Sequence, residues 1–403
     1  MVIVPLKQDS RVDANEEYEY NISYTVESAS AFICIATYTQ GGIKQTVALK
    51  ILREYKDKRY HYDTLEKRLT CQKEAFFKNL KITPGIYEGL GRIVKPTQRE
   101  LEEKLSKKEL QSITLGHIVQ DSEEIKRLSE QDGEYALVMS YLPEEQRLDL
   151  LLQESSVEQQ KELLCLLATR VEQMHKDFQP LTGGVYRGRY KWGSYKQLQK
   201  KLNHNLMHFD LIKQEDPEIH RKYYDLKKIV LHFIKQQAIK EAFENRRKSN
   251  YVKQCHGDLK TKNIWIETIK QNDGPLQHVR ILDAVDFNES YRNIDVLSDL
   301  AMLVVDIEAK GKEDLAIHLR EKYLSLTGQG EDENARIVLT YYLLEKAIVC
   351  AIVCLLYDRD ERQLGQRFLE LAREHADELE KITPSVAEKN FLPMLTQKKL
   401  LLV

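Results

Sequence analysis

The stretch QCHGDLKTKNIWI, from Gln254 to Ile266, places Asp258 and Asn263 in the spacing D-x-x-x-x-N directly before a predicted strand. The residues beyond it predict a hairpin whose second strand ends at Asp283. In phosphoryl transfer, an aspartate of such a loop orients the attacking hydroxyl and accepts its proton, while an asparagine and a second aspartate bind Mg²⁺. The hairpin would bring Asn263 and Asp283 to neighbouring strand ends. We therefore interpret Asp258 as a candidate catalytic residue and the other two as candidate metal ligands.

A lysine upstream fits the same chemistry. The predicted strand QTVALKIL carries Lys50, and a lysine there can pair with the phosphates of a nucleotide and with a glutamate of the next helix. The segment DTLEKRLTCQKEAFFKNL predicts that helix, with Asp63 and Glu66 in capping-box spacing and Glu74 further along. Taken alone, Lys50 is more often a strand-edge lysine and Glu74 a solvated helix residue, but their order before the D-x-x-x-x-N motif favours function. Glu66 is the alternative to Glu74, although its capping position already explains it.

The pattern of the chain changes near Pro143. From Tyr18 onward, short β-branched and aromatic runs separated by turn signals predict a mostly antiparallel sheet interrupted by one helix, whereas helical periodicity predominates after Pro143. We therefore predict an α+β fold, with a β-rich nucleotide-binding lobe over 1–142 and a helical lobe over 143–403 that carries the catalytic loop and the metal site. The charged stretch TQRELEEKLSKKELQ predicts a helical surface insertion at about 98–126.

Composition excludes several classes of protein. The chain has 403 residues, and 61 Lys+Arg against 63 Asp+Glu leave no sequence-wide basic field for nucleic acid or an anionic membrane. Six scattered cysteines without paired C-x-x-C motifs indicate reduced thiols in a cytoplasmic protein. No signal peptide or membrane-spanning helix is predicted, because the most apolar window, YYLLEKAIVCAIVCLLY, is broken by Glu345 and Lys346. The absence of G-x-x-x-x-G-K-[ST] excludes a Walker-type ATPase.

Several motifs in this order resemble a known family. The segments VALK, YALVMSYLP, CHGDLKTKNI and ILDAVDFNESYRNIDVLSDLAML resemble the protein-kinase-like fold and, within it, an uncharacterised branch of the bacterial aminoglycoside-phosphotransferase-like kinases. The resemblance covers roughly residues 18 to 380. It implies a two-lobed fold, with a small antiparallel sheet and one helix in the first lobe and mainly helices in the larger second lobe. It also implies ATP and Mg²⁺ as cofactors.

The resemblance implies a role for each of the residues introduced above. Lys50 would bind phosphate with Glu74 as its helix partner, Asp258 would be the catalytic base, and Asn263 and Asp283 would bind the metal.

Further residues follow from the resemblance or depart from it. Asp299 would brace the catalytic loop, and the backbone around Met139 and Tyr141 would meet the adenine. Lys260 could contact the transferring phosphate, since a positive charge there would stabilise the transition state, although a solvated loop lysine is about equally expected. Asp286, in VDF, is a second candidate metal ligand.

Two further features bear on the interpretation. We interpret His256 as a structural histidine that bonds the backbone of the loop. No G-x-G-x-x-G precedes Lys50, and the corresponding turn would lie near ESASAF.

The leading functional prediction is transfer of the γ-phosphate of ATP to a hydroxyl of a small molecule. The alternatives are a protein kinase, which the sequence DLK favours, and a pseudokinase that binds a nucleotide or a partner protein without turnover, which the missing glycine loop favours. Acidic residues crowd the region 283–308, which would suit a cationic acceptor.

Overall fold

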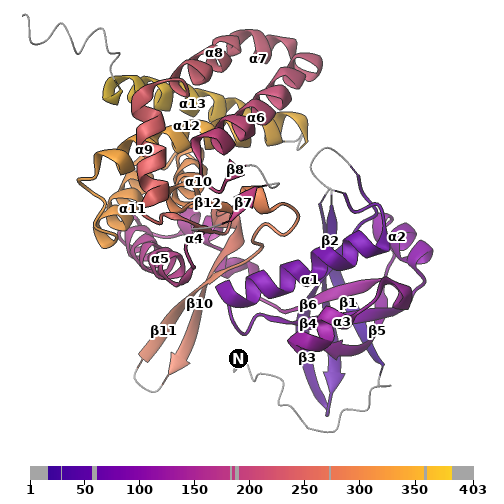
Figure 1. The fold of residues 1–403 in the computed structure, drawn as a ribbon. Coiled ribbons are helices and arrows are strands. Elements are labelled where there is room, and N and C mark those ends of the chain that lie inside the picture. Colours follow the sequence, from indigo (N-terminus) through magenta and orange to yellow (C-terminus); the bar gives the residue numbers. More distant parts are fainter. Residues whose placement is uncertain are drawn as a thin grey trace, which may run out of the picture. The chain divides into compact units, whose positions relative to one another are not determined.

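The computed structural model describes residues 17–28, 30–56, 61–181, 184–186, 190–271, 274–357 and 361–383. The chain divides into two compact units, Met1–Leu151 with Lys262–Glu289, and Leu152–Thr261 with Ser290–Val403. Both helices and strands are well represented, so the predicted α+β class is confirmed (Figure 1). The sequence also predicts a tail in about the last twenty residues, and these lie outside the described residues.

The first unit is built on a closed antiparallel barrel with the strand order β1-β2-β3-β6-β4-β5. Its strands are β1 (Tyr18–Glu27), β2 (Ala31–Gln40), β3 (Ile43–Leu52), β4 (Tyr87–Lys95), β5 (Ser112–Val119) and β6 (Tyr135–Ser140). A two-residue turn, Gly41-Gly42, joins β2 to β3, and both glycines have positive φ, as a twisted hairpin requires. Alternating residues such as Phe32, Leu49 and Val138 fill the barrel core.

The predicted insertion at about 98–126 is wrong in one respect. Only Gln98–Ser106 (α2) and Ser122–Arg127 (α3) are helical, and the residues between them form β5, which pairs with both β1 and β4 and closes the barrel. The segment SITLGHIV has the β-branched composition of a strand, which the charged run before it obscured. Leu101 and Leu105 of α2 are buried in the barrel core, so this charged helix also carries an apolar face.

One long helix, α1 (Leu65–Ile82), follows β3. Its N-cap is Thr64, whose hydroxyl accepts a hydrogen bond from the Lys67 N–H, so the predicted capping box of Asp63 and Glu66 is wrong; Asp63 instead accepts from Lys67 Nζ at 2.7 Å. Arg68 of α1 lies in the interior, where its Nε donates to Glu134 at 2.8 Å.

The hairpin β10 (Ile264–Gln271) and β11 (Gly274–Ile281) belongs to the first unit, although we predicted it in the helical lobe. Its attachment explains the difference. The Thr83 hydroxyl, at the end of α1, donates to the Ile281 carbonyl and accepts from the Ile281 N–H. Trp265 also forms a β-bridge with Arg147. The hairpin follows the predicted boundary at 142/143 in the sequence, but it belongs to the β-rich unit.

The second unit is mainly helical. Its helices are α5 (Val157–Asp177), α6 (Tyr195–Glu215), α7 (Pro217–Lys222), α8 (Tyr224–Phe233), α9 (Gln237–Lys248), α10 (Val296–Glu308), α11 (Glu313–Leu326), α12 (Glu333–Leu356) and α13 (Arg362–Ile382). Helix α4 (Leu148–Glu154) begins before the boundary between the units. The second unit also contains two short strand pairs: β9 (Val252–Gln254) with β12 (Asn293–Asp295), and β7 (Val185–Tyr186) with β8 (Tyr190–Lys191).

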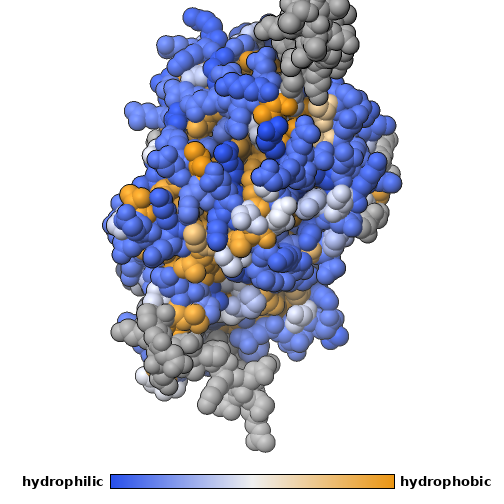
Figure 2. Space-filling view, turned by 90° about the vertical axis from the view of Figure 1, so that its left-hand side faces the viewer, coloured by the Kyte–Doolittle hydropathy of each residue, from blue (hydrophilic) through white to orange (hydrophobic). Residues whose placement is uncertain are grey.

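Helix α12 is the central helix of the second unit and packs against α6, α9, α10 and α13 (Figure 1). By length and composition it could cross a membrane, but 89% of its most apolar window is buried inside the protein, as expected for a core helix. On the face shown in Figure 2, hydrophilic residues predominate and apolar residues form small groups between them.

Candidate functional site

The hairpin brings two of the candidate metal ligands together. Ile264 pairs with Ile281, and the Leu282 N–H donates to the Asn263 carbonyl at 2.9 Å. Asn263 and Asp283 therefore lie at neighbouring ends of β10 and β11, as the sequence predicts. The antiparallel register causes this arrangement, because Asn263, which precedes β10, lies opposite Leu282, which follows β11 and directly precedes Asp283.

Asp283 has a backbone conformation that few side chains adopt. Its φ is +62°, in the left-handed region, where aspartate is better tolerated than most residues. Two hydrogen bonds hold the segment: the Asp283 N–H donates to the Tyr87 hydroxyl at 3.1 Å, and the Ala284 N–H donates to Asn79 Oδ1 at 2.9 Å. The carboxylate itself is 59% exposed. An exposed carboxylate on a conformationally constrained backbone is typical of a ligand-binding position.

Lys50 pairs with Asp283. Its Nζ donates to Asp283 Oδ1 at 2.6 Å. Burial alone would lower the pKa of Lys50, but the charges of Asp283 and Asp286 outweigh it and hold this pKa above its usual value. Burial also raises the pKa of Asp286. Lys50 is therefore a fixed positive charge beside two carboxyl groups.

The structure gives Lys50 a different ion-pair partner from the one that the resemblance implies. Glu74 forms its salt bridge with Lys78, one turn further along α1. Lys78 also donates to the Asp286 carbonyl at 3.2 Å. The sequence analysis missed Lys78, and the i,i+4 spacing of EAFFK was the only signal for it. The role of Glu74 as the partner of Lys50 stays a prediction.

The residues predicted to meet adenine lie on or beside β6. Met139 pairs with Ala48 of β3, and Leu137 pairs with Lys50, so β6 runs beside the strand that carries the lysine. Tyr141 follows the strand end. The contact with adenine stays a prediction.

The turn between β1 and β2 lies where the resemblance would place a glycine-rich sequence. In its described part, the Ser28 N–H and hydroxyl both donate to the Ala31 carbonyl, at 2.9 and 3.0 Å. Ser28 therefore holds this turn closed in the absence of a glycine-rich sequence.

The second unit contains Asp258 and Lys260. Lys260 Nζ lies 2.9 Å from Asp258 Oδ1, and the Asp258 side chain is 36% exposed. Burial would lower the pKa of Lys260, but the charge of Asp258 outweighs it and raises this pKa above its usual value. The two residues of the DLK sequence are thus an ion pair with a carboxylate that solvent can reach.

Asp299, on α10, binds the loop before Asp258. Its carboxylate accepts hydrogen bonds from the His256 N–H at 2.7 Å and the Gly257 N–H at 2.8 Å. The carboxylate is buried, which would raise its pKa, but these bonds and His175 hold the pKa below its usual value. This is the bracing contact that the resemblance implies.

Asp306 binds the other end of the loop, a contact that the sequence analysis missed. Its Oδ2 accepts from the Thr261 N–H at 2.8 Å and from the Thr261 hydroxyl at 2.6 Å, and Lys310 pairs with it. Asp306 lies seven residues after Asp299, which places both carboxylates on one face of α10. This seven-residue spacing is the sequence feature from which the second contact could have been predicted.

His256 has the structural role predicted for it, since the Asp258 N–H donates to its Nδ1 at 3.3 Å. Hydrogen bonds to Asp299 and Asp306 therefore hold the two ends of the loop from His256 to Thr261, and the bond to His256 holds its interior.

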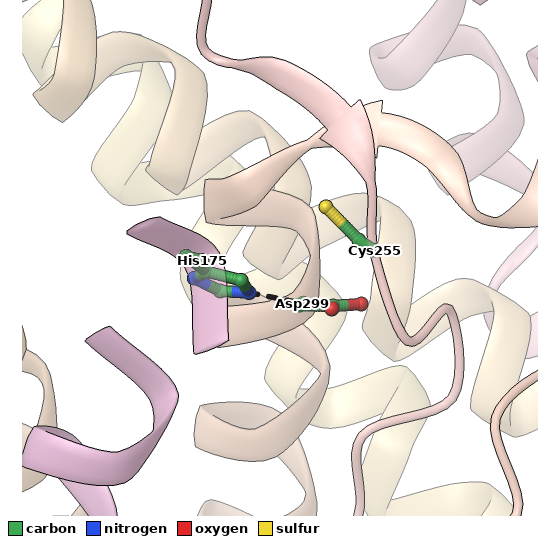
Figure 3. A group of neighbouring side chains, drawn as sticks. All are labelled: His175, Cys255 and Asp299. Atoms are coloured by element: carbon green, nitrogen blue, oxygen red, sulfur yellow. Dashed lines mark hydrogen bonds and ion pairs between the residues drawn. The ribbon is translucent and has the colours of Figure 1, made fainter. Parts of the chain in front are cut away.

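Three buried side chains beside the loop could bind a metal by residue type: His175, Cys255 and Asp299, whose ligand atoms all lie within 4.8 Å of one another. Figure 3 shows His175 and Asp299 directed toward each other. Their hydrogen bonds favour a structural role. His175 Nδ1 bonds the Tyr323 hydroxyl at 2.7 Å, and the Cys255 thiol donates to the Ile294 carbonyl at 3.5 Å. Burial raises the pKa of this thiol, whereas a metal requires the thiolate.

Comparisons with known proteins give fold-level similarities only. No protein-family model matches the chain, and no curated protein matches it. Among solved structures, it is similar to an ethanolamine kinase of Plasmodium vivax (13% identity, 93% of this chain and 86% of that chain, TM-score 0.42). It is also similar to a choline kinase of Cryptosporidium parvum Iowa II (11% identity, 93% of this chain and 92% of that chain, TM-score 0.45). A third similar structure is the ADP-bound aminoglycoside phosphotransferase APH(2'')-Ib (13% identity, 90% of this chain and 96% of that chain, TM-score 0.35).

Proposed function

We propose that this protein is an ATP- and Mg²⁺-dependent phosphotransferase that transfers the γ-phosphate to a hydroxyl of a small molecule. The observation that carries the proposal is the catalytic loop. Asp299 and Asp306 bind the backbone on the two sides of Asp258, yet the carboxylate of Asp258 remains 36% exposed. A rigid loop that presents one reachable carboxylate is what positioning of an attacking hydroxyl requires.

In this proposal, Asp258 orients the acceptor hydroxyl and accepts its proton. Lys260 Nζ, 2.9 Å from Asp258 Oδ1, lies close enough to the carboxylate to stabilise negative charge that develops beside it. Lys50 contributes a fixed positive charge that would pair with the phosphates of the nucleotide. Backbone groups at Met139 and Tyr141 would bind the adenine.

The residues at the hairpin fit a magnesium ion. Asn263 and Asp283 offer amide and carboxylate oxygens, the hard donors that Mg²⁺ prefers, and the Asp283 carboxylate is exposed. When bound, the ion would neutralise the charge of the phosphates. Asp286, whose pKa is raised by burial, is the less suitable ligand because its ionised form is disfavoured.

One experiment tests the function. Wild type and Asp258→Asn are compared for binding of ATP and Mg²⁺ by thermal shift, and for transfer of labelled γ-phosphate to small hydroxyl compounds or to water. The variant is nearly isosteric, so we expect equal binding and a rate lower by ~10²–10⁴. Asp314→Asn, an exposed aspartate in the first turn of α11, is the matched control and should match wild type.

Two outcomes would contradict the proposal. A variant within a few-fold of wild type would show that Asp258 is not catalytic. A wild type that binds ATP but never transfers phosphate would favour the pseudokinase alternative, which the glycine-free turn at Ser28 supports. Label that appears on a protein rather than on a small molecule would favour the protein kinase alternative.

A further inference from the structure

The buried face of α1 carries two neutral polar side chains. The helix packs against β4 and β6 (Figure 1). Gln72 and Asn79 of this helix are each only 1% exposed. They lie seven residues apart, which places both amides on one face of the helix. Each amide bonds the backbone of a different functional segment of the first unit.

Gln72 bonds the backbone of Lys50, whose charge is proposed to pair with the phosphates. Its Nε2 donates to the Lys50 carbonyl at 2.9 Å and to the Tyr135 carbonyl at 3.4 Å. The pairing of β3 with β6 ends at Lys50 and Leu137. Gln72 therefore joins the two strands where their own ladder stops, and it fixes the backbone from which the Lys50 side chain extends.

The other amide atom of Gln72 argues against a role in packing alone. Its Oε1 is buried and has no hydrogen-bond partner among the described residues. Buried polar atoms are nearly always paired, and leaving one unpaired costs stability. An apolar side chain of similar size would avoid this cost. A glutamine retained for its two donor bonds to the strands would not avoid it.

Asn79 bonds the segment that contains the candidate metal ligand Asp283. Its Nδ2 donates to the Ala75 carbonyl of α1 at 2.8 Å, and its Oδ1 accepts from the Ala284 N–H at 2.9 Å. Ala284 is buried, so its N–H depends on a protein acceptor. The N–H of Asp283 itself donates to the hydroxyl of Tyr87, a buried residue of β4.

These two acceptors hold the backbone on both sides of the Asp283 α-carbon. Its φ of +62° is costly for a residue that has a side chain, and such a conformation persists only where the surroundings fix it. The bonds to Asn79 and Tyr87 therefore hold the conformation from which the exposed carboxylate extends. Since Lys50 pairs with this carboxylate at 2.6 Å, α1 acts on both partners of the ion pair.

We propose that Gln72 and Asn79 are positioning residues: Gln72 places Lys50 for the phosphates of the nucleotide, and Asn79, together with Tyr87, places Asp283 for Mg²⁺. This inference rests on the proposed function and deepens it. Groups that orient a metal ligand without touching the metal typically change affinity or activity by about 10–100-fold when they are removed.

The first test measures binding of ATP without turnover. Calorimetry compares wild type, Gln72→Met, Asn79→Leu and Tyr87→Phe, each with Mg²⁺ and with EDTA. In Gln72→Met we expect binding to weaken about tenfold or more in both conditions, because a displaced Lys50 charge acts on the phosphates with or without the metal. In the other two variants, binding in EDTA should stay within about twofold of wild type, while most of the gain from Mg²⁺ is lost.

The matched control is Leu101→Ala. Leu101 lies in the barrel core of the same unit, in a cluster separate from the one that contains the apolar residues of α1. Its variant leaves a cavity and should lower the Tm, as the variants of the buried amides also do. Its affinity for ATP and the gain from Mg²⁺ should nevertheless stay within about twofold of wild type.

The second test uses phosphate transfer by Tyr87→Phe. This variant keeps the ring and removes only the hydroxyl, so it tests the metal segment even if Asn79→Leu fails to fold. We expect the Mg²⁺ concentration that gives the half-maximal rate to rise about tenfold or more. The KM for ATP at saturating Mg²⁺ should change less.

The outcomes separate the positioning roles from the proposed function. Equal losses with Mg²⁺ and with EDTA in all three variants, losses that Leu101→Ala reproduces, or unchanged binding in Gln72→Met and Tyr87→Phe would overturn the positioning roles. A wild type that shows the expected pattern of ATP binding but transfers no phosphate would overturn the phosphotransferase and retain the positioning roles. A wild type that binds no ATP would overturn both.

Discussion

Asp283 in the first unit and Asp299 in the second are both aspartates that the sequence motifs single out, yet their surroundings are opposite. Asp299 is 1% exposed, accepts two backbone N–H groups and contacts His175. Asp283 has an exposed side chain, a left-handed backbone and an ion pair with Lys50. The comparison teaches that burial and hydrogen bonding distinguish a carboxylate that maintains the structure from one available to a ligand. Residue type and motif alone do not distinguish these two kinds of carboxylate.

The largest expected effect on stability is that of Asp299→Ala. The variant leaves the N–H groups of His256 and Gly257 buried without their acceptor and His175 without its carboxylate. We expect the free energy of unfolding to fall by ~3–5 kcal/mol, measured by urea denaturation. Asp283→Ala is the matched variant and should change it by less than about 1 kcal/mol. Equal effects of the two substitutions on the free energy of unfolding would contradict the structural role that distinguishes Asp299 from Asp283.

A second buried pair of the same unit gives a pH-dependent effect. Burial alone would lower the pKa of His375 on α13, but its bonds to Glu308 and Glu378 outweigh this and raise the pKa to about 9, from 6.5. Because the folded pKa is above the unfolded one, the stabilisation is complete below pH 6.5 and is lost as the pH rises toward 9. We expect roughly 3 kcal/mol over this range. His375→Gln should show a flatter dependence of the free energy of unfolding between pH 6 and 9, and a slope equal to that of wild type would refute the assignment.

Asp283→Asn should have a small effect on stability and a large one on ligand binding. Asparagine tolerates the left-handed conformation, so the free energy of unfolding should change by less than about 1 kcal/mol. Because the amide lacks the negative charge, most Mg²⁺-dependent binding of ATP should be lost, as measured by calorimetry with and without the metal. If this binding persists, Asp286 is the better ligand.

The smallest effect on stability is expected for Lys50→Met. Its ion pair with a largely exposed carboxylate contributes at most about 1 kcal/mol, and methionine preserves the length of the side chain. Productive use of ATP should nevertheless weaken, in both binding and turnover. Lys44→Met, at an exposed position of the same strand, is the control and should behave as wild type. Normal turnover of Lys50→Met with normal ATP affinity would remove Lys50 from the site.

The sequence by itself determined the local elements of this protein. The two-residue Gly41-Gly42 turn, the change from strands to helices and the hairpin between Asn263 and Asp283 all follow from short-range patterns. Strand and helix periods, turn residues and antiparallel register are properties of neighbouring residues, and therefore they can be predicted without a structure.

Only the tertiary structure decided which distant groups meet. It closed the barrel with β5, gave Glu74 to Lys78, paired Lys50 with Asp283 and placed Asp306 against Thr261. These contacts depend on how helices and strands pack across more than a hundred residues. A lysine or an aspartate looks the same in sequence whether it is solvated, paired or buried, because its environment is supplied by the rest of the fold.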